Sequence, residues 1–472
     1  MVSFQKFGEF VPGMLPIKMD YAMVRQALEK GKKTKKWVLI FVIGTKPCFY
    51  KFYGAIQAAH KNDLPYLIIN ANQHYDDILT FGINEFDLTE KISINLEIRG
   101  DLAQKSAELY LKCSWLARKM QKDYPDVTTV PIVLGDTILA GIVPSAWMFA
   151  VRTKSINIEA GLRSMTPTAT RKLSFLKIED YLKEQRHGQW ELARNEPFPE
   201  QWDTFVSSAA CEFHFAPIEL NKNHLIREGY PTDNIFVIGN PVMDAVHLKL
   251  AQKPKKSVFE AYPQLEKGEW IRVDIHRREN LTLQRLKSIV HAVKKLVERG
   301  HKINFVQMLA TKEAFNSYGL KDAFEGLKNN PNFLFTDLWP EYGHVVEFYN
   351  SQHCLAALTD SGGVQEDMNV MKKMCLTARF STDRPETANQ SMGNVIVPPF
   401  NADFMANMVH HVVNDEHARK LAASQKPLYG KDVGQKFIGI VEKLIKSKNK
   451  PFKWTHESLG LWQDEDEGVK YL

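Results

Sequence analysis

Short apolar runs alternate with amphipathic stretches along most of this chain. Residues 37–43 form an unbroken apolar run, which is typical of a strand buried on both faces of a parallel sheet. Apolar residues at helical spacing separate such runs, as in 101–122 and 139–151. This alternation predicts an α/β fold with helices on both faces of parallel sheets. The other predicted strands lie at 65–70, 92–96, 130–134, 155–158, 212–215 and 235–238, then at 270–275, 303–307, 333–336, 354–358, 374–377 and 395–397.

The predicted strands form two series that are separated near Asn240 and Pro241. Two series predict two doubly wound, Rossmann-like domains facing a central cleft, because ligands of such sheets bind at the carboxyl ends of the strands. We expect the last long helix, near 433–446, to return to the first domain. The expected parts are an N-terminal extension at 1–36, a first domain at 37–245, a second, nucleotide-binding domain at 246–430, and a terminal helix and tail at 431–472.

One charged and aromatic stretch, residues 165–197, interrupts the alternation and is predicted to be an insertion in the first domain. One helix is expected within it, near 176–186. A lid, an oligomer contact and surface decoration are its three interpretations, and surface decoration is the default for such a segment.

Composition adds a mild basic excess to this picture. The chain has 472 residues, 61 of them Lys or Arg and 55 Asp or Glu, with a net charge of +6. This excess suits a small anionic substrate, and no basic block interleaved with aromatic residues points to nucleic acid. The five cysteines form no CxxC pair, so neither a disulfide framework nor a metal site is expected. Without a signal-peptide pattern or a bilayer-length apolar run, we expect a cytoplasmic protein without membrane insertion.

The stretch TDSGGVQEDMNVMKK at 359–373 is the clearest candidate binding element. A buried strand ends in a glycine pair that opens a helix, so the first free N–H groups of the helix can bind phosphate. Glu366 follows one turn later, where a carboxylate suits a sugar hydroxyl. The stretch therefore predicts a nucleotide or nucleotide-sugar site, and its alternative is a helix cap with a tight turn.

Four titratable residues stand where strands end or helices begin. Asp136 and Glu159 each follow a predicted strand, Glu200 opens a helix, and His276 ends the first strand of the second domain beside Arg277. Each residue alone is explained by a helix cap or a solvated loop. Together they place acids of one domain and a His–Arg cluster of the other at one cleft edge, which is a possible acid–base set facing a phosphate site.

These motifs resemble, in order, those of the UDP-N-acetylglucosamine 2-epimerase family, whose fold is of the GT-B type. The resemblance covers most of the chain, from about residue 38 to about residue 384. The matching motifs are IGTKP at 43–47, NQH at 72–74, GDT at 135–137, IEAGLRS at 158–164, FPE at 198–200, FHFAPIELNKNHLIREG at 213–229, IGNPVMDA at 238–245, HRREN at 276–280, DSGGVQED at 360–367 and DRPE at 383–386.

The resemblance implies an isomerase that interconverts UDP-GlcNAc and UDP-ManNAc by elimination and re-addition of UDP, for polysaccharide or glycan precursor synthesis. It implies no cofactor, neither metal nor nicotinamide, and a homodimer. By motif, the catalytic residues are Asp136, Glu159, Glu200 and His276. The implied substrate-binding residues are Lys46, Lys51, Arg163, Arg277 and Arg384, with Ser361, Gly362 and Gly363 on phosphate and Glu366 on the ribose.

Several positions depart from the family pattern. Lys46 and Cys48 stand where the family usually has Arg and Glu, and Lys lacks the planar fork that grips phosphate oxygens in pairs. Asp203 and Thr204 stand where an Asn–Arg pair is usual. The His-Asn-Pro stretch of the family's substrate-activation site is not found around 307–315.

These departures keep four alternatives open: a hydrolysing 2-epimerase that releases UDP and ManNAc, a 2-epimerase for another UDP-N-acetyl sugar, a GT-B glycosyltransferase, and a nucleotide-sugar-binding protein without activity.

Overall fold

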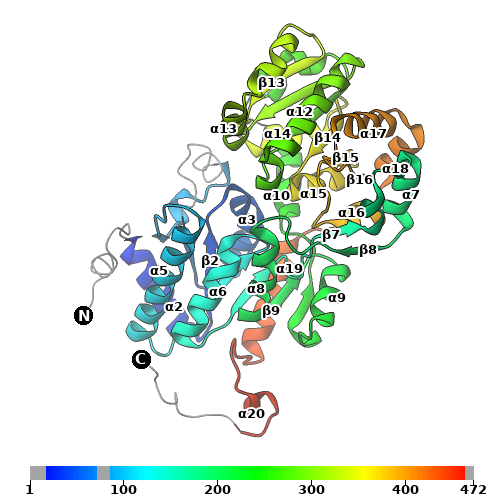
Figure 1. Cartoon of the computed structure of the whole chain (residues 1–472). Coiled ribbons are helices and arrows are strands. Elements are labelled where there is room, and N and C mark those ends of the chain that lie inside the picture. Colours follow the sequence, from blue (N-terminus) through cyan, green and yellow to red (C-terminus); the bar gives the residue numbers. More distant parts are fainter. Residues whose placement is uncertain (1–16, 72–84, 253, 255, 463–472) are drawn as a thin grey trace.

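The computed structural model describes residues 17–71, 85–252, 254 and 256–462, which form two α/β units, one above the other in Figure 1. The first sheet has the order β1-β4-β3-β2-β5-β6-β9-β10 among these residues. Its neighbouring strands pair in parallel, except β1 with β4. The order reverses between β2 and β5, which creates a ligand crevice at the strands' carboxyl ends. The strands are β1 (Lys18–Met19), β2 (Val38–Ile43), β3 (Tyr66–Asn70), β4 (Ile94–Asn95), β5 (Thr129–Leu134), β6 (Ser155–Ile158), β9 (Cys211–Ala216) and β10 (Ile235–Val237).

The apolar run of β2 is explained by two cores, one on each face of the first sheet. Phe41 packs in the core with α3, α10 and α19, whereas Ile40 and Val42 pack in the core with α2, α5 and α6. Because side chains alternate along a strand, burial on both faces requires every residue to be apolar. The helices named so far, with α8 and α9, are α2 (Tyr21–Thr34), α3 (Lys46–Lys61), α5 (Leu102–Asp123), α6 (Ile138–Val151), α8 (Glu200–Ala210), α9 (Glu219–Arg227), α10 (Val242–Ala251) and α19 (Val433–Lys446).

The second sheet repeats the same design with the order β13-β12-β11-β14-β15-β16, all parallel. The predicted α/β class with two parallel-sheet units is therefore confirmed. Its strands are β11 (Trp270–Asp274), β12 (Lys302–Gln307), β13 (Phe333–Asp337), β14 (Cys354–Thr359), β15 (Met374–Thr377) and β16 (Asn394–Ile396). Its helices are α11 (Val258–Ala261), α12 (Leu283–Glu298), α13 (Leu309–Tyr318), α14 (Tyr342–Asn350), α15 (Gly362–Val370), α16 (Pro385–Asn389), α17 (Ala402–Asn414) and α18 (Glu416–Ser424).

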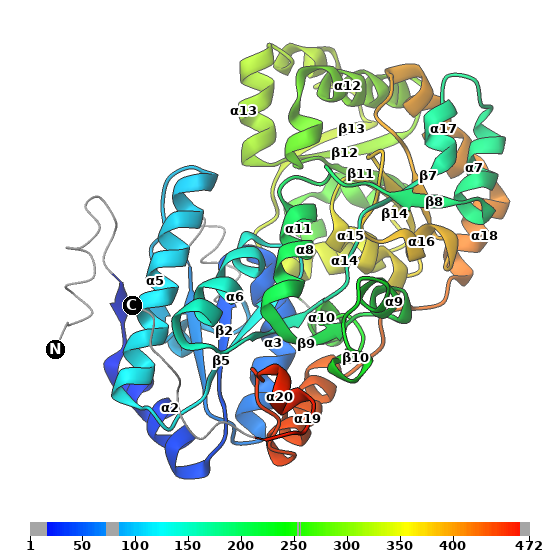
Figure 2. The same ribbon diagram turned by 60° about the horizontal axis from the view of Figure 1, so that its bottom comes forward.

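Residues 165–197, here called the bridging segment, leave the first unit and dock on the second. They form the hairpin β7 (Met165–Pro167) and β8 (Trp190–Leu192) and the helix α7 (Ile178–His187), which lies beside α16 (Figures 1 and 2). Tyr181 and Leu182 are buried in the core of the second sheet. Gln185 exchanges two hydrogen bonds with the backbone of Ile396 on the edge strand β16, at 2.7 and 2.8 Å. The default expectation of surface decoration is therefore wrong, because this segment buries apolar and polar groups in the second unit.

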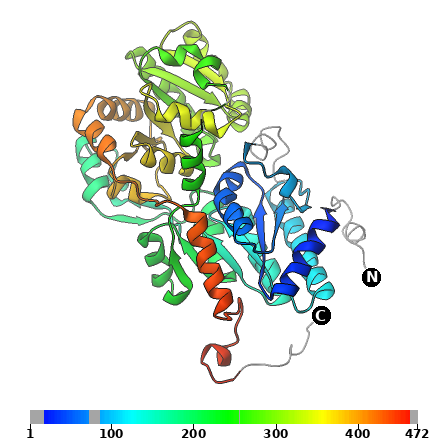
Figure 3. The same cartoon turned by 180° about the vertical axis from the view of Figure 1, so that it is seen from behind.

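The chain end returns to the first unit, as Figure 3 shows from behind. The N-terminus of α19 is capped by Asp244 of α10, which accepts hydrogen bonds from the amides of Val433 and Gly434 at 2.9 and 2.7 Å. Here α19 crosses α3 so closely that a Cβ on Gly434 would lie 2.1 Å from the carbonyl carbon of Gly54. A short helix, α20 (Thr455–Ser458), follows. In the described part of the chain, no helix has the length and apolar character needed to cross a membrane.

Candidate active site

A cavity of about 590 Å³ lies between the two units, where the carboxyl ends of both sheets face each other. This volume is in the range of small-molecule sites, about 300–1,000 Å³. The first unit contributes residues that follow β2, β5 and β6 and the start of α8, and the second unit contributes residues that follow β11, β13 and β14. The charged and hydroxyl wall residues include Thr45, Lys51, Asp136, Thr137, Glu159, Glu200, Asp203, Arg272, Asp274, His276, Arg277, Arg278, Ser361, Asp367 and Arg384.

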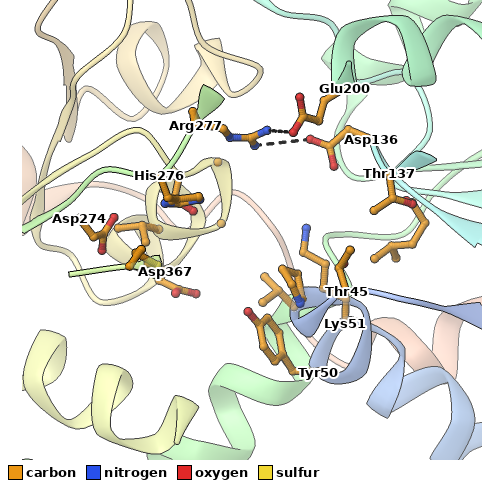
Figure 4. A pocket seen from close by; sticks show the side chains of 18 of the residues that line it. Thr45, Tyr50, Lys51, Asp136, Thr137, Glu200, Asp274, His276, Arg277 and Asp367 are labelled. Atoms are coloured by element: carbon orange, nitrogen blue, oxygen red, sulfur yellow. Dashed lines mark hydrogen bonds and ion pairs between the residues drawn. The ribbon is translucent and has the colours of Figure 1, made fainter. Parts of the chain in front are cut away.

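Two acids of the first unit face an arginine of the second across this cavity (Figure 4). The Arg277 guanidinium lies 2.5 Å from Glu200 Oε1 and 3.8 Å from Asp136 Oδ2. Burial raises the pKa of Asp136, although Arg277 acts in the opposite direction. Burial alone would lower the pKa of Arg277, but Glu200 and Asp136 outweigh it and raise this pKa. The arrangement gives two carboxylates held beside a permanent cation.

Asp360 fixes the loop that carries His276 and Arg277. Its carboxylate accepts hydrogen bonds from the amides of both residues and from Asn280 Nδ2, at 3.0–3.1 Å. His276 Nδ1 lies 3.3 Å from Asp360 Oδ1. Asp360 is fully buried directly after β14, so the HRREN loop and the glycine pair of α15 are built around one carboxylate.

The glycine pair lies at the cavity as predicted, with Ser361, Gly362 and Gly363 on its wall. Ser361 is the N-cap of α15, so the first amides of this helix have no partner within the helix and can bind an anion. A Cβ on Gly362 would lie 2.9 Å from an Asp383 oxygen, whereas the nearest atom to a Cβ on Gly363 would be 3.9 Å away. The Gly363 side of the helix therefore has the more open surroundings.

Behind the wall, a buried ion cluster joins the two units. Lys51 Nζ lies 2.7 and 2.8 Å from the two Glu159 oxygens and 3.7 Å from Glu366 Oε2. Asn240 donates to both carboxylates at 2.8 Å, and Arg384 pairs with Glu366 through Nε and lies 3.5 Å from Glu159. All five side chains are buried. Removing one member of such a cluster leaves an uncompensated buried charge.

Glu159 is held in this cluster by an unusual backbone conformation. Its φ is +63°, in the left-handed region that non-glycine residues rarely adopt. A Cβ on the neighbouring Gly135 would lie 2.8 Å from Glu159 Oε2. Strain of this kind persists where surrounding contacts over-determine it, here the contacts with Lys51 and Asn240.

The structure brings most of the predicted site residues together at the cavity. Two predicted substrate-binding residues are not on its wall among the described residues: Arg163, which pairs with Glu228 at 2.5–2.7 Å, and Glu366, which is enclosed in the ion cluster. Glu228 lies 65 positions further along the chain, so sequence reasoning could not supply the partner of Arg163. The Lys46 side chain and the NQH motif at 72–74 lie outside what the structure describes.

Asp367, which follows Glu366, is a wall residue that the sequence reasoning missed. It accepts a hydrogen bond from the Tyr342 hydroxyl at 2.6 Å, and burial raises its pKa to about 7. Tyr342 stacks on Tyr50 of the first unit, with ring centroids 4.6 Å apart. Trp339 and Arg272 also line this end, with the guanidinium 4.6 Å from the indole centroid. Aromatic side chains at a cavity wall offer stacking surfaces, but their spacing in the sequence carries no such signal.

No group of three or more His, Cys, Asp or Glu side chains in the described ranges could hold a metal ion. The five cysteines are buried and free.

Comparison with known proteins gives a consistent result. Residues 192–442 match the family model for UDP-N-acetylglucosamine 2-epimerase. The UDP-N-acetylglucosamine 2-epimerase of Methanocaldococcus jannaschii is 28% identical over 367 residues, which is 76% of this chain and 88% of that protein. The enzyme of the same name from Neisseria meningitidis is 28% identical over 258 residues, or 53% and 66% of the two chains.

Solved structures show the same fold. The structure of the M. jannaschii UDP-GlcNAc 2-epimerase in complex with UDP-GlcNAc and UDP has a TM-score of 0.69 at 24% identity, over 86% of this chain and 99% of that one. The N. meningitidis enzyme bound to UDP-GlcNAc has a TM-score of 0.67 at 22% identity, over 86% and 99%.

Proposed function

This chain belongs to the UDP-N-acetylglucosamine 2-epimerase family, and we propose on this premise that it interconverts UDP-GlcNAc and UDP-ManNAc at the cavity between its two units. The observation that carries the proposal is the meeting of Asp136 and Glu200 with Arg277 and the amides of the Ser361–Gly363 turn around one cavity. Acids can move a proton at the sugar, while a cation and helix amides hold a diphosphate.

The reaction requires an elimination, because the C2–H bond of the sugar is not next to a carbonyl. A carboxylate takes the C2 proton, the C–H electron pair forms the C1=C2 double bond, and the C1–O bond breaks with its electron pair leaving on UDP. The resulting 2-acetamidoglycal then receives a proton at C2 on the opposite face, while a diphosphate oxygen bonds again to C1. Two groups that exchange protons, and cations for the departing diphosphate, are therefore needed.

We assign the proton transfers to Asp136 and Glu200, whose carboxylates lie on the wall beside Arg277. His276 is the remaining titratable group of the predicted catalytic set, and it projects from the loop that Asp360 holds. Glu159, the third predicted acid, is bound by Lys51 and Asn240, so its proposed role is to hold Lys51 toward the diphosphate.

For the ribose we propose Asp367 in place of Glu366. Both are acids of α15, but Asp367 lines the cavity and shares the open face of Gly363 one turn earlier. A carboxylate at that place can accept hydrogen bonds from two ribose hydroxyls. Trp339 and Tyr342 lie on the same part of the wall and offer apolar surface to a base.

Two further parts of the proposal concern the protein's setting. We propose a cytoplasmic location, which the five buried free cysteines support because thiols persist in reducing compartments. We also propose a homodimer, as the family resemblance implies, and light scattering of the purified protein tests it.

The deciding experiment is proton NMR of the purified protein with UDP-GlcNAc in D₂O. New UDP-ManNAc signals with deuterium at C2 are expected. Free UDP with free N-acetylmannosamine would instead establish hydrolysis of the intermediate. No change with any UDP-N-acetyl sugar would contradict the proposed function.

A further inference from the structure

Asp203 is a buried carboxyl group at the cavity that no part of the proposed mechanism uses. It lies in the first turn of α8, three residues after Glu200, and is fully buried on the cavity wall. Neither of its carboxyl oxygens has a hydrogen-bond partner, and Glu200 Oε2 is also buried without one. Residues three apart on a helix lie on the same face, so Asp203 adds a third carboxyl group to Asp136 and Glu200.

The space for Asp203 is made by a glycine on the neighbouring helix. A Cβ on Gly141 of α6 would lie 2.3 Å from Asp203 Oδ1, so any other residue there would displace the carboxyl group. The contact is tight and excludes water from this side. The Asp203 carboxyl group is thus enclosed between α6 and α8 and meets the rest of the site on the side of Asp136 and Glu200.

The elements packed around α8 supply no compensating positive charge in the described residues. Helix α6 has no charged side chain between Ile138 and Val151, and β6 has none either. On β9, Glu212 accepts from Asn234 at 2.9 Å, and His214 packs against Tyr230.

The cations near this part of the site pair elsewhere. Arg277 pairs with Glu200 and Asp136, and Arg163 with Glu228. Asp203 therefore faces two acids and has no cation of its own among the residues that the structure describes.

An ionised carboxylate in this place would be unstable. Burying an unpaired charge costs several kcal/mol, and two nearby carboxylates add repulsion, so the group keeps its proton instead. Burial first, and then Asp136 and Glu200, raise the pKa of Asp203 to about 8. At neutral pH the neutral acid adds no charge to the site.

We propose that Asp203 is a positioning residue of the reaction centre that stays protonated at neutral pH, keeps the charge of the Asp136–Glu200–Arg277 group low enough to admit an anionic substrate, and sets the alkaline limit of turnover when it ionises. The inference rests on the proposed epimerase function, which supplies the anionic substrate. Asp203 acts through its neighbours and is not assigned a proton transfer.

The test compares the pH dependence of kcat/KM for the full chain and for Asp203→Asn, which keeps the shape and is neutral at every pH. The wild-type protein should lose activity above about pH 8, and the Asn variant should keep its neutral-pH activity within about threefold and lack this alkaline decline. Superimposable profiles would overturn the inference. Asp203→Ser, which also lacks a titratable group, gives the same comparison if the Asn variant does not fold.

Asp244→Asn is the matched control, because Asp244 is a largely buried acid of the first unit that caps α19 away from the cavity. Its alkaline decline should equal that of the wild type.

A second measurement does not depend on activity. The infrared difference between the wild type and Asp203→Asn should contain a protonated-carboxyl C=O band at about pH 6 that disappears by about pH 10. Absence of that band at the lower pH would refute a protonated Asp203 even if turnover is never seen. Failure of the epimerase proposal itself would appear separately, as no turnover of any UDP-N-acetyl sugar by the wild type.

Discussion

Two adjacent acids of α15 have different surroundings, so exchanging each for its amide should have different consequences. Glu366 is fully buried beside Arg384 and Lys51, whereas Asp367 lines the cavity and accepts from Tyr342. Glu366→Gln keeps an oxygen for Asn240 but removes the negative charge opposite both cations. Asp367→Asn keeps an acceptor for the Tyr342 hydroxyl and changes the cavity wall.

The magnitudes follow from these contacts. Breaking a buried ion pair by removing one partner costs about 3–5 kcal/mol. For a domain of roughly 200 residues, about 2–4 °C of Tm is lost per kcal/mol, so Glu366→Gln should lower Tm by roughly 6–20 °C. Asp367→Asn weakens one hydrogen bond, about 1 kcal/mol, and should lower Tm by a few degrees.

Ribose binding should respond in the reverse order. The assay is calorimetric titration with UDP and with its 2′,3′-dideoxy analogue, at about pH 8, where most Asp367 is ionised. A hydrogen bond to a charged group contributes about 1.5–3 kcal/mol, so the wild type should prefer UDP on the order of ten- to hundredfold. Asp367→Asn should remove most of this preference, and Glu366→Gln should retain it. A variant Glu366→Gln with normal Tm and no preference for the ribose hydroxyls would refute the assignment.

Three further perturbations test other parts of the site. Asp136→Asn should reduce turnover roughly 10²–10⁴-fold, because it removes a proton-transfer group, while leaving the Kd for UDP within about threefold. Arg277→Gln removes the cation beside Asp136 and Glu200, which raises the pKa of each carboxyl, so the acid limb of the kcat/KM profile should move to higher pH; an unmoved limb would exclude Arg277 from this role. Gln185→Ala leaves two buried backbone groups of Ile396 unpaired, at about 1–3 kcal/mol each, and should lower Tm and kcat together, whereas Lys183→Ala on the exposed side of α7 should change neither.

The fold could be predicted because its strands are buried on both faces and its site residues follow strand ends. The runs that became β2 and β11 carry this signal in consecutive residues, and Asp136 and His276 follow β5 and β11 closely. The pairings could not be predicted, since they join residues far apart in the chain. Arg163 looks like a phosphate ligand until Glu228 is placed beside it.

The choice between Glu366 and Asp367 shows the same limit on a smaller scale. Successive residues of a helix point about 100° apart, so neighbours in sequence face different surroundings. Gly362 and Glu366, one turn apart, face Asp383 and Arg384, while Gly363 and Asp367 face the cavity. The sequence shows that two acids follow the glycine pair, and the rotation of α15 against its sheet decides which one meets the ligand.

The bridging segment connects this chemistry to the arrangement of the two units. It begins six residues after Glu159 and ends three residues before Glu200, and between these points it is fixed to the second unit. Met165 and Thr382 exchange two backbone hydrogen bonds of 2.8 Å, Ser164 contacts Ser381 at 3.0 Å, and Glu196 pairs with Arg285. A rotation that opened the cleft would have to break these contacts or pull on the chain beside both carboxylates. The positions of Glu159 and Glu200 therefore depend on the second unit being docked, because the segment between them belongs to the first unit by sequence and to the second by packing.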